Sequence, residues 1–420
     1  MTDLRTSLRR VADAVEPLPV ADDLWHRAQA ARRRGQVLAA AAVLAIIASV
    51  TWSAVLLGTD DREARTASQE VPGGAIPSRI EDPGDLPATD DLAVGRASVA
   101  FVNRDGDPVV LTATDGVPHR LALPDWDRSR RALALTPDGT ALAYQRTRGE
   151  DTVLVRVDLG SGRERVLFSQ PGDSLTYDSL AWSSDGTRLS WSASTFGDVP
   201  AVGVVEPLLS RSRIVALPYT PTNAVVAPDG TLAISAANGA LRLDSRQGGS
   251  TRIETQRSAV VAGFSPDGRY VALATGPASA SYTLDVRRRV VVEHPFPEGT
   301  LGESVVRPVG WLDDRLQLLV VQALDGSGAE LVVTTPEVDD TSTWRRSVGS
   351  VGGPGVANSL SVAVDLVPDL DGTSSQQLTH DFGEPVAVGQ RDISWMIGLG
   401  VAAAIALGMA LRWLWRRLLG

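Results

Sequence analysis

The stretch SPDGRYVAL at residues 265–273 joins a tight turn to the beginning of an alternating strand. Proline presets the first central angle of a type I turn, aspartate bonds nearby backbone groups, and glycine closes the turn at low steric cost. The alternation of apolar and polar residues that follows is typical of a strand with one buried face. Because an apolar run also precedes the turn, the stretch predicts a hairpin.

The same phrase occurs three more times, as TPDGTALAY at 136–144, SSDGTRLSW at 183–191 and APDGTLAIS at 227–235. A weaker fifth copy is GWLDDRLQLLVV at 310–321. Repeats of about 40–50 residues that hold several strands each are typical of a β-propeller. We expect the turn residues to be structural, and they are Asp138, Gly139, Asp185, Gly186, Asp229, Gly230, Asp267 and Gly268.

Counting the copies predicts an all-β, six-bladed propeller over residues 95–370, with seven blades as the alternative. The repeat at 131–168 divides into four short apolar runs, as one blade requires. The pattern at 358–369 has no blade of its own, so we expect it to return and complete the first blade. Joining the two ends in this way protects sheet edges.

Two uncharged apolar stretches, at 37–57 and 393–411, flank the repeats. A helix needs about 20 apolar residues to cross a bilayer, so both stretches predict transmembrane helices. Arginines precede the first stretch and follow the second, which places both termini in the cytoplasm and the propeller on the extracytoplasmic side of the cytoplasmic membrane. The predicted parts are a cytoplasmic segment (1–36), transmembrane helix (37–57), flexible linker (58–94), propeller (95–370), return linker (371–392), transmembrane helix (393–411) and basic cytoplasmic tail (412–420).

Composition excludes several classes of function. The chain has no cysteine, so thiol catalysis and cysteine-containing zinc sites are excluded. All 40 basic residues are arginine, which suggests a GC-rich bacterial genome. The acidic excess lies between the two apolar stretches and disfavours nucleic acid as a partner.

The repeated turns and the strands after them resemble those of TolB-type, WD-repeat-like β-propellers of bacterial envelope proteins. The resemblance covers about residues 95–370 and implies a rigid face for binding a protein or peptide. It says little about the ligand, because the turn motif is specific for the fold.

The N-terminal segment carries one apolar stripe, formed by Leu4, Leu8, Val11 and Val15 at helical spacing. A helix of this length is marginal alone, so the stripe needs a surface to cover it. A partner protein, the membrane surface and a topological role without a partner are the three alternatives. The layout resembles actinobacterial membrane proteins whose short N-terminal helix faces a sigma factor, which implies signalling to a cytoplasmic regulator.

No catalytic motif occurs in the sequence: a G-x-S-x-G elbow, a phosphate-binding loop and metal-binding histidine spacings are all missing. The sequence therefore favours a non-enzymatic binding module, a sensor or scaffold, without cofactor or metal. The alternative is a lactonase-like hydrolase with a divalent metal in the central channel. Four polar residues at the starts of innermost strands are candidate ligand-binding residues at the channel mouth: Arg130, Asp178, Asn223 and Glu303.

Overall fold

The computed structural model describes residues 70–129, 132–148, 151–170, 176–196, 199–255, 259–297, 304–325, 328–335, 345–369, 373, 375–383, 408, 412 and 415. Contacts divide the chain into two units, Met1–Ser68 and Gln69–Gly420, and every described residue lies in the second. The expected N-terminal stripe of Leu4, Leu8, Val11 and Val15 therefore lies outside the described residues.

Three sheets repeat one plan, in which four consecutive antiparallel strands pair in chain order. The first contains β6 (Leu133–Leu135), β7 (Ala141–Arg148), β8 (Asp151–Asp158) and β9 (Glu164–Gln170). The second contains β10 (Thr176–Trp182), β11 (Leu189–Phe196), β12 (Val199–Glu206) and β13 (Arg211–Ala216), with the 3₁₀ turn η1 (Pro207–Leu209) between the last two. The third contains β14 (Pro221–Val226), β15 (Leu232–Ala236), β16 (Leu241–Asp244) and β17 (Ser250–Ile253).

The remaining strands form one five-stranded and one nine-stranded sheet. The five-stranded sheet has β2 (Ala88–Thr89), β3 (Ala97–Val102), β4 (Pro108–Thr112), β5 (Pro118–Leu121) and β26 (Ser361–Val362). The nine-stranded sheet has β1 (Arg79–Ile80), β18 (Ala259–Phe264), β19 (Tyr270–Ala278), β20 (Ala280–Asp285), β21 (Val290–Pro295), β22 (Ser304–Trp311), β23 (Gln317–Ala323), β24 (Ala329–Thr334) and β25 (Arg345–Val351). Helix α3 (Gly353–Ser359) and the 3₁₀ turn η2 (Val364–Leu366) flank β26.

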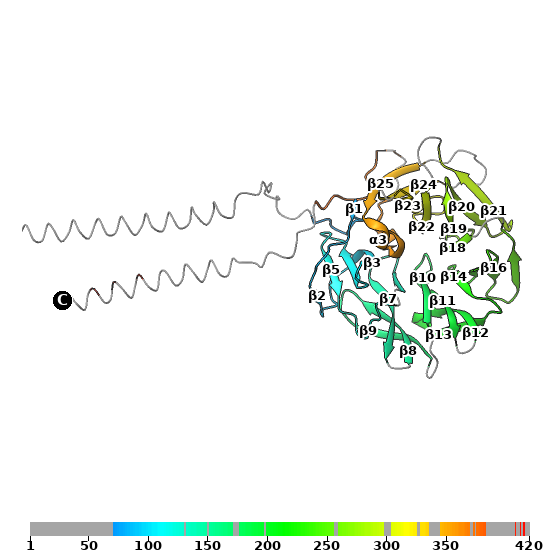
Figure 1. Ribbon diagram of the computed structural model, residues 1–420, viewed down its shortest axis with the longest axis horizontal. Helices are drawn as coiled ribbons and strands as arrows, with labels where there is room; N and C mark the ends of the chain where they lie inside the picture. Colours follow the sequence, from blue (N-terminus) through cyan, green and yellow to red (C-terminus); the bar gives the residue numbers. More distant parts are fainter. Residues whose placement is uncertain are drawn as a thin grey trace, which may run out of the picture. The chain divides into compact units, whose positions relative to one another are not determined.

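The sheets lie around a common centre, with β10, β14 and β18 toward it and β9, β13 and β21 at the periphery (Figure 1). The expected return of residues 358–369 to the first blade is confirmed. Strand β26 pairs antiparallel with β3, at Ser361↔Ala100 and Val362↔Val99. One sheet therefore holds strands from both ends of the repeat region.

The predicted fold class is wrong in two respects. The blades are not six separate sheets, because the described strands form five. Strand β19 is nine residues long, and its end pairs with β22 at Thr275↔Val306 and Ala278↔Ser304, which merges two repeats.

The two predicted transmembrane helices are the second correction. In the part of the chain that the structure describes, no helix has the length and apolar character needed to cross a bilayer. The stretch 37–57 lies outside the described residues, and only Gly408 of the stretch 393–411 is described.

The predicted flexible linker at 58–94 also differs from the structure. Its described part, 70–94, contains β1 and β2, which pair in parallel with the outer strands β25 and β5. Few apolar residues occur there, but Ile76, Ile80, Leu86 and Leu92 are all buried. These four side chains anchor a segment whose overall composition resembles a linker.

The core lies between neighbouring sheets rather than on one face of each. Trp191 on β11 is fully buried and stacks on Phe168 from the preceding sheet, with ring centroids 5.8 Å apart. Gly203 on β12 lies opposite Trp191 and leaves the space that the indole fills. Both sheet faces are therefore packed, which explains strands such as β3 in which every residue is buried.

Candidate functional site

The repeated turns are built from hydrogen bonds to the aspartate. Asp138 accepts bonds from the Thr136 hydroxyl at 2.6 Å and from the Thr140 backbone N–H at 3.0 Å. Burial opposes ionisation, but these hydrogen bonds outweigh it and hold the pKa of the Asp138 carboxyl below its usual value. Gly139 has φ +73°, and a Cβ there would lie 2.0 Å from the Ala97 carbonyl oxygen, so only glycine fits.

The other copies repeat this arrangement. The backbone N–H two residues after each aspartate donates to its carboxylate at Asp185, Asp229 and Asp267, at 3.1, 2.8 and 3.0 Å. Gly186, Gly230 and Gly268 all have positive φ. The carboxylates of these four copies are used within their own turns, so we treat the motif as structural.

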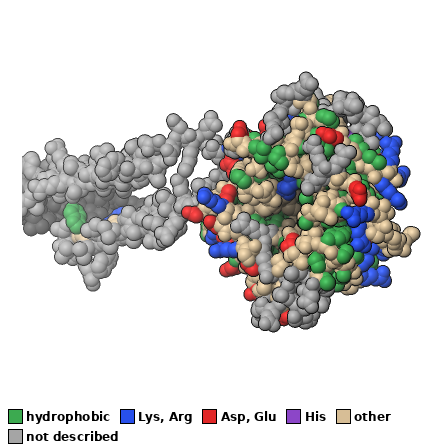
Figure 2. Space-filling model, turned by 45° about the vertical axis from the view of Figure 1, so that its right-hand side comes forward, with side chains coloured by type: hydrophobic (Ala, Val, Ile, Leu, Met, Phe, Trp, Pro, Cys, Tyr) green, Lys and Arg blue, Asp and Glu red, His purple; other side chains and the backbone are tan. Residues whose placement is uncertain are grey.

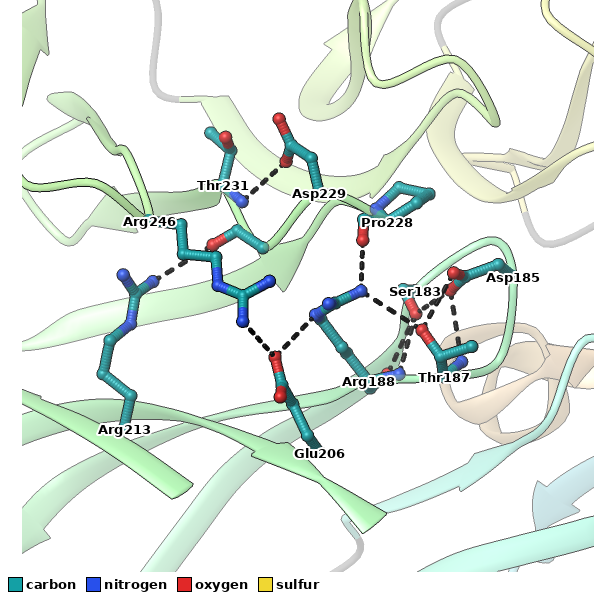
Figure 3. Close-up of polar contacts among 11 residues, drawn as sticks. Ser183, Asp185, Thr187, Arg188, Glu206, Arg213, Pro228, Asp229, Thr231 and Arg246 are labelled. Carbon is teal, nitrogen blue, oxygen red and sulfur yellow. Dashed lines mark hydrogen bonds and ion pairs between the residues drawn. The ribbon is translucent and has the colours of Figure 1, made fainter. Parts of the chain in front are cut away.

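An ion-pair junction links two of these turns (Figure 3). Arg188, just after the turn of Asp185, pairs with Glu206 at 3.0 Å and donates to the Pro228 carbonyl in the turn of the next sheet. Arg246 lies 3.8 Å from the same Glu206 oxygen. Glu206 is thus neutralised by two guanidinium groups, and the junction holds neighbouring sheets together.

The described structure includes two of the four predicted channel-mouth residues, Asp178 and Asn223. Arg130 and Glu303 lie outside the described residues. Asp178 is exposed and accepts a hydrogen bond from Ser194 at 3.3 Å. Asn223 donates to the Val261 carbonyl at 2.7 Å and accepts from the Ala224 N–H, so its amide links β14 to β18.

A pocket of about 210 Å³ lies beside the five-stranded sheet, where the segment leading from β5 to β6 passes the loop between β3 and β4. These ends of the strands are opposite the ends that carry the Asp-Gly turns. We call it the arginine pocket. Its lining comprises Ala88, Asp107, Arg120, Leu121, Ala122, Leu123, Trp126 and Arg128.

Local structure fixes the pocket's aromatic wall. Asp125 has φ +51°, which turns the chain so that Trp126 forms a bridge with Arg146 on β7. The Thr147 N–H donates to the Asp125 carbonyl at 3.2 Å. The Trp126 indole N–H donates to the Gly106 carbonyl at 2.8 Å, and this ties the wall to the neighbouring loop.

One carboxylate in the pocket serves two guanidinium groups. Asp107 is buried and makes two bonds with Arg128, to Nε at 2.6 Å and to Nη2 at 3.2 Å. Arg120 Nη1 reaches the same carboxylate at only 3.4 Å, and its buried Nε has no hydrogen-bond partner. The pocket therefore has one unbalanced positive charge and an unused donor, beside an indole ring.

Sequence reasoning missed these residues. Asp107 and Arg128 are 21 positions apart, and only the fold brings them together. The available signal was the run PDWDR at 124–128, in which a tryptophan lies between charged residues in a connecting segment. Among the described residues, no group of three or more metal-ligating side chains is placed to hold an ion.

The mainly antiparallel sheets around a common centre, four of which carry the repeated Asp-Gly turn, define a β-propeller-like protein. No protein-family model and no curated protein sequence matches the chain. Solved structures similar to it include TolB from Acinetobacter baumannii, at 15% identity and TM-score 0.43, covering 61% of this chain and 65% of that one. The match thus spans less than two thirds of that TolB.

Two further structures are similar at 15% identity. A TolB described as putative, from Agrobacterium tumefaciens, has TM-score 0.40 and coverage of 63% of this chain and 92% of that one. The Swd1 β-propeller domain from Myceliophteria thermophila has TM-score 0.38 and coverage of 53% and 70%. The expected resemblance to TolB and WD-repeat-like propellers is thus found among solved structures, whereas membrane anchoring and an actinobacterial source are not shown.

Proposed function

We propose that the protein is a non-enzymatic binding module that anchors a carboxylate of a protein or peptide partner in the arginine pocket. The two guanidinium groups of Arg120 and Arg128, which share the single carboxylate of Asp107 in this pocket, are the observation that carries this proposal. A second carboxylate balances the remaining positive charge, and hydrogen bonds between a guanidinium group and a carboxylate are among the strong ones.

The pocket's surroundings favour a peptide side chain over a free inorganic anion. Trp126 supplies an apolar and aromatic wall, and Leu121 and Leu123 add apolar surface. A partner that places an acidic residue next to an aliphatic one matches both features. Tryptophan and arginine are also the residues that most often dominate protein interfaces.

A random dodecapeptide phage library, selected on the immobilised full-length protein, tests this function. We expect selected peptides to share an acidic residue beside an apolar one. Arg120→Met should weaken their binding at least tenfold, because the anchoring guanidinium is lost. The matched control Arg252→Met removes an exposed arginine on β17 and should leave binding unchanged. Peptides without a shared acidic residue, or equal binding to Arg120→Met, would contradict the proposal.

The expected signalling role of residues 1–36 rests on sequence alone. We propose it only as a contact between this segment and a regulatory protein. Co-purification of candidate sigma factors with the full-length protein, compared with a Leu8→Asp variant, tests it. Recovery of the same amount with both proteins would argue against the contact.

A further inference from the structure

The outer edge of β13 is open in the described structure. Its sheet ends at this strand, with order β10-β11-β12-β13. The Leu217 N–H donates to the Pro200 carbonyl, so Leu217 and Pro200 form a hydrogen-bonded pair. In an antiparallel ladder every second residue forms such a pair, so Arg211, Arg213 and Val215 also bond β12. The backbone groups of Ser212, Ile214 and Ala216 therefore point away from β12, toward the open edge.

Exposed apolar side chains gather at this edge. In the turn before β13, Leu208 is 82% exposed and Leu209 56% exposed, and Ile214 within the strand is 39% exposed. Arg165 on β9 of the preceding sheet donates to the Ser210 hydroxyl at 3.0 Å, so the outer strand of that sheet lies next to the beginning of β13 here.

The same edge is positively charged. Arg165, Arg211 and Arg213 pair with no carboxylate of the described residues: Arg165 bonds Ser210, and Arg213 reaches the carbonyls of Gly230 and Ser245. Glu206, the cross-strand partner of Arg211, is already neutralised by Arg188 and Arg246, and Glu164 pairs with Arg146. An acidic partner is therefore the complementary one.

The charge extends over this side of the body. Residues 199–255 and 259–297 hold nine arginines and seven acidic residues, while residues 70–129 hold five arginines and eleven acidic residues. Figure 2 shows arginine side chains gathered on the right-hand side of the body with hydrophobic ones between them, and more acidic side chains on the left. An acidic segment is thus attracted to one side of the ring.

The fold itself shows how an extended segment binds an outer edge. Strand β1 pairs in parallel with the outer strand β25, and the Ser350 and Gly352 N–H groups donate to the Ser78 and Ile80 carbonyls at 2.8 and 2.7 Å. Strand β2 pairs with β5 in the same way. Residues 70–94 of the same chain therefore cover two outer edges, those of β25 and β5. The outer edge of β13 is of the same kind, and no described strand pairs with it.

We propose that the β13 edge binds an extended acidic peptide of a partner protein by strand addition. Backbone bonds at Ser212 and Ile214 hold the peptide, apolar side chains contact Leu209 and Ile214, and acidic side chains meet Arg165 and Arg211. This surface is separate from the arginine pocket, and neither proposal depends on the other.

A lipid surface fits less well. Leu208 and Leu209 project from a turn flanked by arginine, but Ile214 lies within a strand. Acyl chains also cannot satisfy the outward backbone groups of β13, which a peptide strand does satisfy.

The test uses full-length protein and fluorescein-labelled decapeptides in an anisotropy titration. One probe alternates glutamate with valine, a second replaces glutamate with lysine, and a third is the first probe with alternate backbone nitrogens methylated. We expect the first probe alone to bind, and its affinity to fall several-fold between 50 and 500 mM NaCl.

Two variants locate the site. Ile214→Pro removes one outward N–H and should weaken the first probe at least tenfold, while the control Val291→Pro removes the equivalent outward N–H of β21 and should not. Arg211→Glu keeps the backbone intact and should also weaken the probe at least fivefold. Thermal unfolding of each variant verifies folding.

Three outcomes overturn the proposal. The first is that the methylated probe binds as tightly as the first probe. The second is that Val291→Pro lowers the affinity for the first probe as much as Ile214→Pro does. The third is that Arg211→Glu leaves this affinity unchanged. In a parallel experiment, the protein is sedimented with phosphatidylglycerol vesicles. If it sediments with them only when Leu208 and Leu209 are intact, and the first probe does not bind, the surface is a lipid-binding one instead.

Discussion

Gly203 shows how a single residue sets the spacing between sheets. A Cβ at this position would lie 2.3 Å from the Trp191 ring, and Trp191 is fully buried between Phe168 and Tyr177. The indole cannot move away without disturbing both rings. The core packing around Trp191 therefore requires that residue 203 have no side chain.

We expect Gly203→Ala to lower the free energy of unfolding by about 1–3 kcal/mol, the usual cost of overpacking a core. The control Gly276→Ala also changes a strand glycine, but nothing lies within 4 Å of the added Cβ, so stability should change little. Urea unfolding followed by tryptophan fluorescence measures both. Equal effects of the two substitutions would show that Trp191 does not limit this position.

His294 links stability to pH. It is buried on β21 and forms a hydrogen bond with the Thr283 hydroxyl at 2.9 Å. Burial lowers the pKa of His294 to about 4. In the unfolded chain the histidine pKa is about 6.5, so the unfolded state binds more protons between these two values.

Stability should therefore fall as pH falls from about 6.5 to about 4, with a contribution from His294 of about 3 kcal/mol. The lowered pKa values of Asp138 and Asp185 act in the same direction, but only at still lower pH. Urea unfolding at pH 7.0, 5.5 and 4.5 measures the effect. The variant His294→Gln should lose less stability over this range, and an unchanged pH dependence would contradict the assignment.

At the scale of elements, Arg307 fixes α3 to β22. Its Nε donates to the Ala357 carbonyl at 3.0 Å and its Nη2 to the Leu360 carbonyl at 3.2 Å. Burial lowers the pKa of Arg307 to about 10, so the group still carries its charge at neutral pH. Carbonyls at the end of a helix need such partners, because the helix itself leaves them unpaired.

We expect Arg307→Met to lower the free energy of unfolding by about 2–4 kcal/mol, since two carbonyls lose their partner. Amide hydrogen exchange over residues 353–360 should accelerate, because the helix loses one of the contacts that hold it. The exposed Arg315→Met serves as the control and should change neither quantity. Unchanged exchange in Arg307→Met would mean that the other contacts of α3, which are its buried Val356 and Ala357 and the bonds of Ser359 to Val102, hold the helix without Arg307.

The hairpins were predictable from sequence because turn and strands are adjacent in the chain. Asp138, Asp185, Asp229 and Asp267 each act within a few residues, so local chemistry specifies them. The return of β26 to β3 was also predictable, since an alternating run was left without a partner. The merging of the repeats that contain β19 and β22 into one sheet was not predictable from sequence, because it depends on how far β19 extends past its partner β18.

Short strands and distant clusters were beyond sequence reasoning. Strands β1 and β2 have two residues each, too few for a periodic pattern. The buried side chains of Ile76 and Ile80 anchor the chain at β1, and those of Leu86 and Leu92 anchor it on either side of β2. The arginine pocket joins residues from two strands, β2 and β5, and two connecting segments. Of the four channel-mouth residues, Asp178 and Asn223 are described and bond neighbouring strands, and the shared site stays a prediction.

At the scale of the whole molecule, the two proposed binding surfaces use different parts of the ring. The arginine pocket lies beside the five-stranded sheet, in the acidic part of the sequence, where a local positive charge stands out. The β13 edge lies in the arginine-rich part and at the periphery. A propeller-like body suits this division, because rigid sheets hold separate surfaces in fixed places.

The crystal structure of the protein with a peptide from the phage selection tests the central claim most directly. We predict a peptide carboxylate within about 3.2 Å of a guanidinium nitrogen of Arg120, with the adjoining apolar side chain against Trp126. A peptide bound elsewhere on the protein, with no carboxylate at Arg120, would contradict the account.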